Sequence, residues 1–281
     1  MIVAPEEVAA RRSGARPPAV LDTRDEAAFA AGHLEGAGNV PEPELEIRRA
    51  ELPPRDHPVL VVAADRGGAE AAAARLHDMG YADVDHVAAN AERIPGGLAS
   101  TAPPARLWRP APFLERVLPG IRRGRAADLA AGSGREAVFL ALHGFEVEAW
   151  DHAPEALDRA RRLASRHGVS LRTVVADLER DPRLPVAAWD LIVCFRFLHR
   201  PLFPAIERAL APGGTLVYET YRVGQERFGR PTHARFLLAS GELSSAFPGL
   251  TVLSYEEPEP PRGPVTARLL AMRPGSSDSA S

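Results

Sequence analysis

Apolar runs of strand length alternate with amphipathic segments of helix length along most of this chain. The runs at 59–63 and 191–195 are almost uninterrupted by polar residues, which is typical of parallel strands that are covered on both faces. In the first 90 residues the pattern predicts strands over 19–22, 59–63 and 84–87, and helices over 25–31, where Asp25 is the expected N-cap, and 69–79. Further along it predicts strands over 125–130, 145–150, 171–176, 189–195, 214–220, 250–255 and 265–272, with helices over 135–143, 154–167 and 203–210. This alternation, closed by two successive strands, predicts an α/β fold with a mostly parallel, doubly wound sheet and an antiparallel edge.

The region between the two series is rich in proline and glycine. Residues 88–112 contain seven of them among few sustained apolar runs, which is typical of a linker. We therefore expect a first domain over 1–95, a linker over 96–112, a second domain over 113–274 and a serine-rich disordered tail over 275–281.

Four acids fall at the ends of predicted strands. The run 127–136 has an apolar strand, Asp128, a small-residue loop and the start of a helix, where backbone N–H groups are unpaired and a ligand can approach closely. Asp151 ends the next apolar segment, 23 residues later, the spacing at which a second strand presents a carboxylate to a ribose. Asp177 ends the following strand, and Asp190 opens the one after it.

Composition excludes several classes of function. The net charge of −3 gives no indication of a polyanionic partner, and the absence of lysine excludes Schiff-base chemistry. A single cysteine, Cys194, permits no intrachain disulfide and no cysteine zinc site, so we expect no metal and a reducing, cytoplasmic setting. No apolar run approaches the roughly 20 residues that a membrane span needs, and the first residues do not resemble a signal peptide.

The segment of about 106–273 resembles a class I S-adenosylmethionine-dependent methyltransferase. The resemblance rests on the acids at the strand ends, the small-residue loop, Asp190 and the turn 212–214. The segments 144–151, 240–243, 255–257 and 267–271 are more narrowly similar to the tellurite-resistance methyltransferase group. The resemblance implies S-adenosylmethionine as cofactor, with its amino-acid end at loop 130–134, its ribose at Asp151 and its adenine at Asp177 and Leu178. The expected cofactor-binding residues are Asp128, Ala130, Gly132, Gly134, Asp151, His152, Asp177 and Leu178. The loop departs from the family at Ala130, where glycine is usual, and we expect this alanine to be tolerated if its φ is negative.

Methyl transfer is an in-line displacement in which the enzyme mainly aligns the reactants and excludes water, with a base if the acceptor carries a proton. Candidate catalytic groups lie where the fourth and fifth strands of the second domain end: His199, Tyr218 and Glu219. Each has a structural alternative: His199 as a helix cap, Tyr218 as core, and Glu219 as the partner of Arg222 or Arg235.

Candidate residues for an anionic substrate are Arg196, Arg200, Arg222, Arg230 and Arg235, although any single arginine can instead be a surface residue. Glu242 is read either as a site residue or as a helix start capped by Ser240, and Cys194 as buried and inert.

The segment 20–41 resembles a rhodanese domain, with its Asp-x-Arg start and its Gly-His-x-x-Gly-Ala-x-Asn-x-Pro end. The resemblance extends over about 5–90 and implies an α/β domain. A rhodanese carries sulfur on a cysteine in the loop after the central strand, but loop 63–69 has alanine at the expected position. Sulfur transfer is therefore not expected. Anion binding by Arg66, Gly67 and Gly68 and a docking or stabilising role both stay open.

The resulting fold class is an N-terminal rhodanese-like α/β domain followed by a Rossmann-like, doubly wound methyltransferase domain with an antiparallel edge hairpin. The expected function is methyl transfer to a small-molecule nucleophile: a thiol, a chalcogen or metalloid oxyanion, or another small metabolite. The alternative is a non-enzymatic, cofactor-sensing scaffold that docks a partner through its rhodanese-like domain. Nucleic acid and membrane partners are not expected, since the fourth strand is followed by Arg196-Phe197-Leu198-His199 and not by an Asn/Asp-Pro-Pro-aromatic motif. A homodimer and a protein partner bound by the first domain both stay open.

Overall fold

The computed structural model describes residues 1–88, 98–260 and 263–275. The chain divides into two compact units, Met1–Arg109 and Pro110–Ser281. Residues 89–97 of the expected linker and 276–281 of the expected tail lie outside the described residues, so both expectations stay predictions there.

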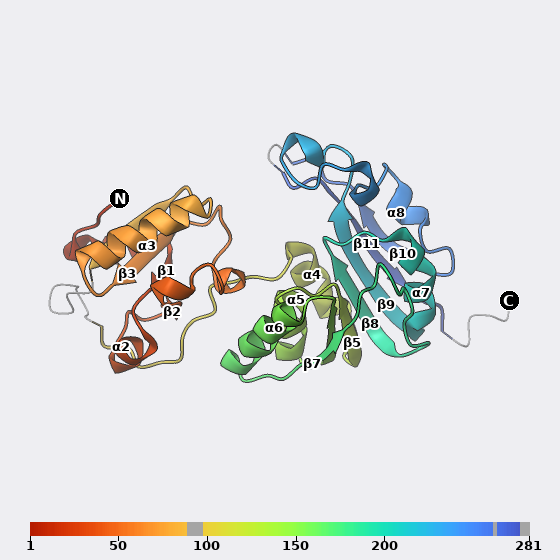
Figure 1. Cartoon of the computed structure of the whole chain (residues 1–281), viewed down its shortest axis with the longest axis horizontal. Helices are drawn as coiled ribbons and strands as arrows, with labels where there is room; N and C mark the ends of the chain where they lie inside the picture. Colours follow the sequence, from red (N-terminus) through yellow and green to blue (C-terminus); the bar gives the residue numbers. More distant parts are fainter. Residues whose placement is uncertain (89–97, 261–262, 276–281) are drawn as a thin grey trace. The chain divides into compact units, whose positions relative to one another are not determined.

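The first unit is a small parallel sheet with helices (Figure 1). Its strands have the order β2-β1-β3-β4, and every pairing is parallel. The elements are β1 (Ala19–Asp22), β2 (Gly38–Asn39), β3 (Val59–Ala63), β4 (Val84–Ala88), α1 (Val8–Arg12), α2 (Glu26–Ala31) and α3 (Arg66–Asp78). Asp25 caps α2 as predicted, by accepting a hydrogen bond from the Ala28 N–H. Helix α3 begins three residues before the predicted start because Asp65 caps it through the Gly68 N–H.

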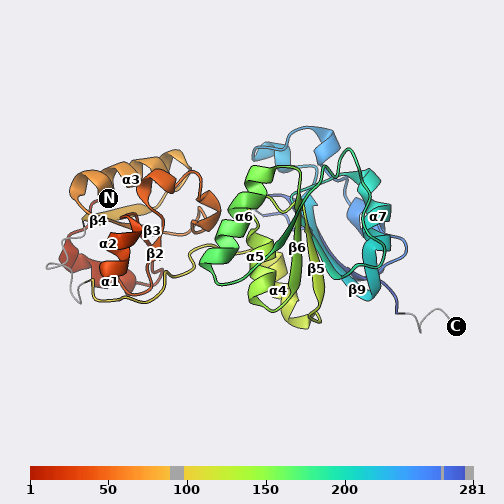
Figure 2. The same ribbon diagram turned by 60° about the horizontal axis from the view of Figure 1, so that its bottom comes forward.

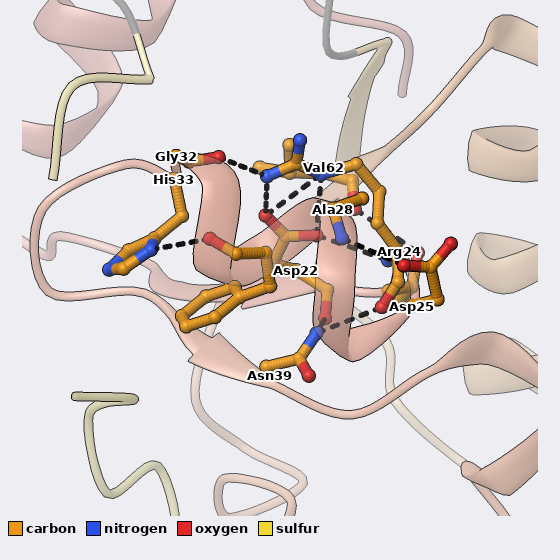
Figure 3. A network of polar contacts seen from close by, with 10 residues as sticks. Asp22, Arg24, Asp25, Ala28, Gly32, His33, Asn39 and Val62 are labelled. Atoms are coloured by element: carbon orange, nitrogen blue, oxygen red, sulfur yellow. Dashed lines mark hydrogen bonds and ion pairs between the residues drawn. The ribbon is translucent and has the colours of Figure 1, made fainter. Parts of the chain in front are cut away.

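A buried ion pair organises the rhodanese-like segment of this unit (Figure 3). Asp22 is fully buried at the end of β1, and its carboxylate oxygens lie 3.0 and 2.6 Å from Nε and Nη2 of Arg24. Nη2 of Arg24 also donates to the Gly32 carbonyl. The Asn39 amide donates to the carbonyls of Asp22 and Arg24, while His33 stacks on Phe29 with ring centroids 3.7 Å apart. These residues, which carry the sequence resemblance, therefore hold the sheet edge together.

Part of the expected linker is attached to the first unit. Ser100 and His33 exchange two backbone hydrogen bonds, and the Ala105 N–H donates to the Ala37 carbonyl. A Cβ at Gly38 would lie 2.4 Å from Leu107, so this glycine lets the segment pass close to β2. The unit consequently extends to Arg109 in space, beyond the sequence boundary expected at residue 95.

The second unit contains a seven-stranded sheet of order β10-β11-β9-β8-β5-β6-β7 (Figure 1). The five strands from β9 to β7 are parallel, whereas β11 is antiparallel to both β9 and β10. This arrangement confirms the predicted parallel sheet with an antiparallel edge. The strands are β5 (Arg125–Leu129), β6 (Glu146–Asp151), β7 (Arg172–Val175), β8 (Trp189–Phe195), β9 (Leu210–Tyr221), β10 (Thr251–Glu256) and β11 (Thr266–Met272).

Helices cover both faces of this sheet (Figures 1 and 2). Helices α4 (Pro112–Val117), α5 (Arg135–Leu142) and α6 (Pro154–Arg166) lie on one face, and α7 (Phe203–Ala209) and α8 (Glu242–Ser245) lie on the other. The face under α7 and α8 is packed by alternate strand residues such as Leu129, Cys194, Tyr218 and Leu269, all fully buried. Burial raises the pKa of the Cys194 thiol to about 12, so this cysteine is inert as expected.

Short or irregular elements differ from the sequence predictions. Helices α1, α4 and α8 span four to six residues and carry too little periodicity to be detected. Helix α8 begins after Gly241, and Ser240 donates to Glu257 instead of capping the helix, so the predicted Ser240 cap is wrong. Strand β9 starts at Leu210, before the predicted 214, with a register shift against β8. Single 3-10 turns lie at Pro5–Glu7, Glu42–Glu44, Arg49–Glu51, Leu118–Gly120, Arg200–Leu202, Gln225–Arg227 and Ala234–Phe236.

The turn between β5 and α5 has three residues in the left-handed region. Ala130, Gly132 and Gly134 have φ values of 58°, 55° and 76°. Glycine is required at position 134 for two reasons: its φ is positive, and a Cβ there would lie 2.5 Å from the Cβ of Ala160 on α6. The condition under which an alanine is easily tolerated at 130, a negative φ, is not met: Ala130 has a backbone conformation that favours glycine and costs an L-residue about 1–2 kcal/mol.

We expect Ala130→Gly to stabilise the second unit. Removing the methyl group relieves the left-handed strain, and the added freedom of the unfolded chain offsets part of this gain, which leaves about 0.5–1 kcal/mol. Urea unfolding followed by tryptophan fluorescence measures the change. Ala131→Gly is the control: Ala131 itself does not have a positive φ, so glycine should destabilise the protein there. Equal destabilisation by both variants would contradict the strain at Ala130.

We expect Asp22→Asn to loosen the sheet of the first unit around the C-terminal end of β1. The variant leaves the buried Arg24 guanidinium without its charge partner, at a cost of about 3 kcal/mol. Hydrogen exchange in the full chain should show faster exchange of the β1 and β3 amides, with α5 and β8 unchanged. Asp78→Asn, on an exposed position of α3, should leave all four elements unchanged. Undiminished protection of β1 in Asp22→Asn would show that the ion pair does not hold this edge.

Candidate functional site

Three predicted carboxylates lie at the carboxyl ends of neighbouring strands. Strands β5, β6 and β7 run parallel and side by side, so their C-terminal ends share one edge of the sheet (Figure 1). Asp128 is the penultimate residue of β5, Asp151 is the last of β6, and Asp177 follows β7 by two residues. Asp190 lies at the opposite end of β8, where it accepts a hydrogen bond from the Arg125 N–H. The sequence therefore identified this edge correctly, and Asp190 lies away from it.

Asp151 joins the β5–α5 turn to the start of α6. Its Oδ2 accepts the Gly132 N–H at 2.8 Å, and its Oδ1 accepts the Ala153 N–H at 2.9 Å. The side chain is only 9% exposed, yet a carboxylate has about four acceptor positions, so two remain for a ligand. His152 is largely exposed, with Nδ1 3.4 Å from Asp151 Oδ1.

The other two carboxylates differ in exposure. Asp128 is buried, with Oδ2 accepting the Ala137 N–H at the start of α5, and burial raises its pKa well above the usual range. Asp177 is exposed, and its Oδ1 accepts the N–H groups of Glu179 and Arg180. Leu178 beside it is buried in the core. Asp128 thus holds the start of α5, whereas Asp151 and Asp177 face the edge of the sheet where β5, β6 and β7 end.

A cavity of about 630 Å³ opens beyond the ends of β8 and β9. Its walls come from the residues after β7, the residues after β8, the end of β9 and the segment 230–236. The lining residues are Glu179, Arg196, Phe197, Leu198, Thr220, Tyr221, Arg230, Pro231, Thr232, His233 and Phe236. Because β8 lies next to β5, the cavity and the carboxylates occupy the same edge of one sheet.

The structure does not place the three predicted catalytic side chains in this cavity. Tyr218 is fully buried, donates a hydrogen bond from its hydroxyl to the Phe197 carbonyl, and has its pKa raised by burial. Glu219 is buried on the opposite face of β9, where it accepts from the Thr266 hydroxyl and pairs with Arg268 at 3.3 Å. The structural alternative paired Glu219 with Arg222 or Arg235, but its ion-pair partner is Arg268.

His199 is half-buried at the start of a 3-10 turn, and its ring caps no N–H group there. It does not line the cavity, and only its carbonyl takes part in the turn, by accepting the Leu202 N–H. A catalytic role for His199 stays a prediction without a contact to support it.

The predicted substrate arginines separate into paired and unpaired groups. Arg200 forms a two-pronged ion pair with Glu242 and donates to the carbonyls of Arg235 and Leu237. Arg222 is buried and pairs with Glu259 at 2.9 Å. Arg235 lies 4.0 Å from Glu179. Two of the predicted arginines, Arg196 and Arg230, line the cavity without a carboxylate partner among the described residues.

Several lining residues were not singled out from the sequence. Thr220 is buried at the end of β9, and His233 and Phe236 lie on the segment that Arg200 holds. The signal that could have identified them is the polar, glycine- and proline-containing stretch that follows a strand end, which is where binding loops occur in such sheets.

The loop of the first unit that resembles an anion cradle is already closed by a carboxylate. Asp65 accepts the Gly68 N–H at 2.8 Å, and Arg66 pairs with Glu70. Of the three residues named for anion binding, Arg66 and Gly68 are therefore already engaged within the chain. Anion binding at this loop and a docking or stabilising role both stay predictions.

Among residues 1–88, 98–260 and 263–275 there is no cluster of three histidine, cysteine or acidic side chains that could hold a metal ion. Over the same ranges no helix is long and apolar enough to cross a membrane.

Comparison with known protein families finds two matches in this chain. Residues 4–89 match the rhodanese-like domain, and residues 126–214 match a methyltransferase domain. The second match begins in β5 and ends within β9, so it contains the acid-bearing edge described above.

Several known proteins share part of their length with this chain. The probable S-adenosyl-L-methionine-dependent methyltransferase TehB of Haemophilus influenzae is 24% identical over 47% of this chain and 48% of its own length. The demethylmenaquinone methyltransferase of Thermus thermophilus is 37% identical over 33% of this chain and 45% of its own. The chain thus spans about half the length of these two relatives. An uncharacterized protein of Schizosaccharomyces pombe, UNK4.09, is 22% identical over 80% of this chain and 83% of its own, a range too long to fit within either unit.

The crystal structure of Haemophilus influenzae TehB has the same fold as the second unit. It superposes with a TM-score of 0.50 at 18% identity, covering 59% of this chain and 62% of TehB. Together with the family matches, this shows that the chain contains a rhodanese-like domain and a methyltransferase domain, the second with the fold of TehB.

Proposed function

We propose that this protein binds S-adenosylmethionine over the ends of β5, β6 and β7 and transfers its methyl group to a small acceptor held in the adjoining cavity. The observation that carries the proposal is the shared sheet edge: acid-bearing strand ends lie next to a 630 Å³ cavity beyond β8 and β9. A cofactor bound over the ends of β5, β6 and β7 would have its reactive end directed toward the cavity beyond β8 and β9.

The residues at this edge fit the cofactor. A Cβ built at Gly132 meets no atom within 4 Å, so the backbone of the turn is open to a ligand. Asp151 has acceptor capacity left for the two hydroxyl groups of a ribose, and Asp177 Oδ2 has its nearest cation, Arg180, 3.9 Å away. Asp151 would hold the ribose, and Asp177 with Leu178 would contact the adenine.

When bound, the cofactor supplies an electrophilic methyl group on a sulfonium sulfur. The acceptor's lone pair forms the new bond to carbon, and the electrons of the breaking carbon–sulfur bond stay on sulfur. The chain's own contribution is to orient the acceptor in line and to exclude water, which needs no covalent enzyme intermediate.

A proton on the acceptor has few destinations in the cavity. His233 Nδ1 accepts the Arg235 N–H at 3.2 Å, so the neutral ring carries its proton on Nε2 and donates there. Glu179 is the lining carboxylate that can accept a proton. This supports acceptors that are already ionised or readily ionised, such as a thiol or another acidic nucleophile.

We infer that the rhodanese-like domain does not itself transfer sulfur. Its loop has alanine at the expected nucleophile, and Cys194 is buried in the core of the other unit. A docking or stabilising role fits this domain, because Asp65 already caps the N-terminus of α3.

We expect Asp151→Asn to weaken S-adenosylmethionine binding at least tenfold, or about 1.4 kcal/mol. The asparagine amide replaces an acceptor by a donor, which cannot bind both the turn N–H groups and a ribose hydroxyl. Calorimetric titration with S-adenosylmethionine and with its demethylated product measures the affinity. Asp158→Asn, an exposed change on α6, is the matched control and should bind as the wild type does.

Two results would contradict the proposal. Unchanged affinity in Asp151→Asn would place the cofactor elsewhere. Failure of the wild type to bind either compound at millimolar concentration would favour the non-enzymatic scaffold, with the turn closed by Ala130.

A further inference from the structure

The cavity wall carries two arginines that the chain leaves without partners. The guanidinium groups of Arg196 and Arg230 form no ion pair and no hydrogen bond with any described residue, although both line the cavity. Elsewhere on the same edge, Arg200 and Arg222 are bound to carboxylates at 2.5 and 2.9 Å. The fold therefore neutralises the arginines that it uses structurally and leaves positive charge in the cavity.

The remaining charges near the cavity do not cancel this excess. Glu179 is the one acidic side chain in the lining, and Arg235 lies 4.0 Å from it. His233 is a neutral donor at Nε2 when its Nδ1 accepts the Arg235 N–H. An anion entering the cavity would thus meet two arginines whose charges are not offset by the lining.

Arg196 is also held in an unusual backbone conformation. Its φ of 58° is left-handed, and its N–H donates to the Glu219 carbonyl at 2.8 Å directly after β8. A non-glycine residue in this region costs about 1–2 kcal/mol, and such strain concentrates at binding and catalytic positions where the surrounding structure enforces it. Here the strand end enforces it on the residue that brings a free guanidinium to the cavity.

Three aromatic side chains also line the cavity. Phe197, Tyr221 and Phe236 are each half-buried and line the cavity beside the two arginines. The Arg235 guanidinium lies over the ring of Phe236, 4.3 Å from its centroid. Aromatic faces favour flat apolar groups, and the volume of about 630 Å³ is larger than an inorganic oxyanion requires.

We propose that the cavity binds a planar, apolar small molecule that bears one anionic group, with Arg196 and Arg230 on the anion and Phe197, Tyr221 and Phe236 around the ring. That this molecule is the methyl acceptor rests on the function proposed above. The binding site itself does not, since none of the residues that line it is one of those proposed to hold the cofactor. Guanidinium donors suit a carboxylate, sulfonate or phosphate equally, so the class is defined by charge and shape.

The test uses two fluorescent probes that differ in one group. 8-Anilinonaphthalene-1-sulfonate carries a sulfonate, and N-phenyl-1-naphthylamine is the same ring system without it. Both are titrated into full-length wild type, Arg196→Gln and Arg230→Gln. Arg183→Gln is the matched control, because this arginine is 86% exposed, pairs with Asp181, and does not line the cavity.

We expect saturable binding of the sulfonate probe to the wild type, at least tenfold weaker in Arg196→Gln and in Arg230→Gln and unchanged in Arg183→Gln. Binding of the uncharged probe should not change in any variant. Circular dichroism and the affinity for S-adenosylmethionine should also be unchanged, which separates loss of the anion site from misfolding.

The inference is overturned if the wild type does not bind the sulfonate probe saturably, or if both cavity variants bind it as the wild type does. Loss of both probes in a variant that is folded would show a general apolar site without anion recognition, which also overturns it. If the wild type binds the sulfonate probe but not S-adenosylmethionine, the anion site stands and the proposed function fails.

Discussion

The arrangement of the second unit depends on one carboxylate, that of Asp151. Its two oxygens accept N–H groups from the β5–α5 turn and from the entry to α6, at 2.8 and 2.9 Å. These bonds hold the left-handed turn 130–134 against the end of β6 and leave its backbone open at Gly132. Because parallel strands end together, the same edge also carries Asp177 and the cavity beyond β8. A single buried acid thus shapes the turn and faces the place where a ribose would bind.

The segment after β9 adds the second half of the site. It has few regular elements of its own, and Arg200 anchors it by donating to the carbonyls of Arg235 and Leu237 while pairing with Glu242. Glu242 in turn accepts the Ala239 N–H, and Arg200 lowers the pKa of this carboxyl. Arg200, predicted to bind substrate, is therefore a positioning residue: it holds the wall that carries Phe236. Arg196 and Arg230, which have no carboxylate partner among the described residues, line the same cavity.

Sequence reasoning predicted the long elements and the acid-bearing edge, because hydrophobic periodicity and strand-end acids are local signals. It did not predict side-chain direction at the strand ends. Tyr218 and Glu219 are adjacent in sequence but point to opposite faces of β9, and which face meets the cavity depends on long-range packing against β8 and β11. The partner of Glu219, Arg268, lies on a strand 47 residues or more away in sequence. The left-handed φ of Ala130 was also missed, since alanine gives no local indication of it.

The most direct test of this account is a crystal structure of the protein with S-adenosylhomocysteine. The account predicts that the ribose hydroxyls lie within hydrogen-bonding distance of Asp151, that the adenine lies beside Asp177 and Leu178, and that the sulfur faces the cavity lined by Arg196 and Phe197. A ligand that binds elsewhere, or one whose sulfur faces away from that cavity, would contradict it.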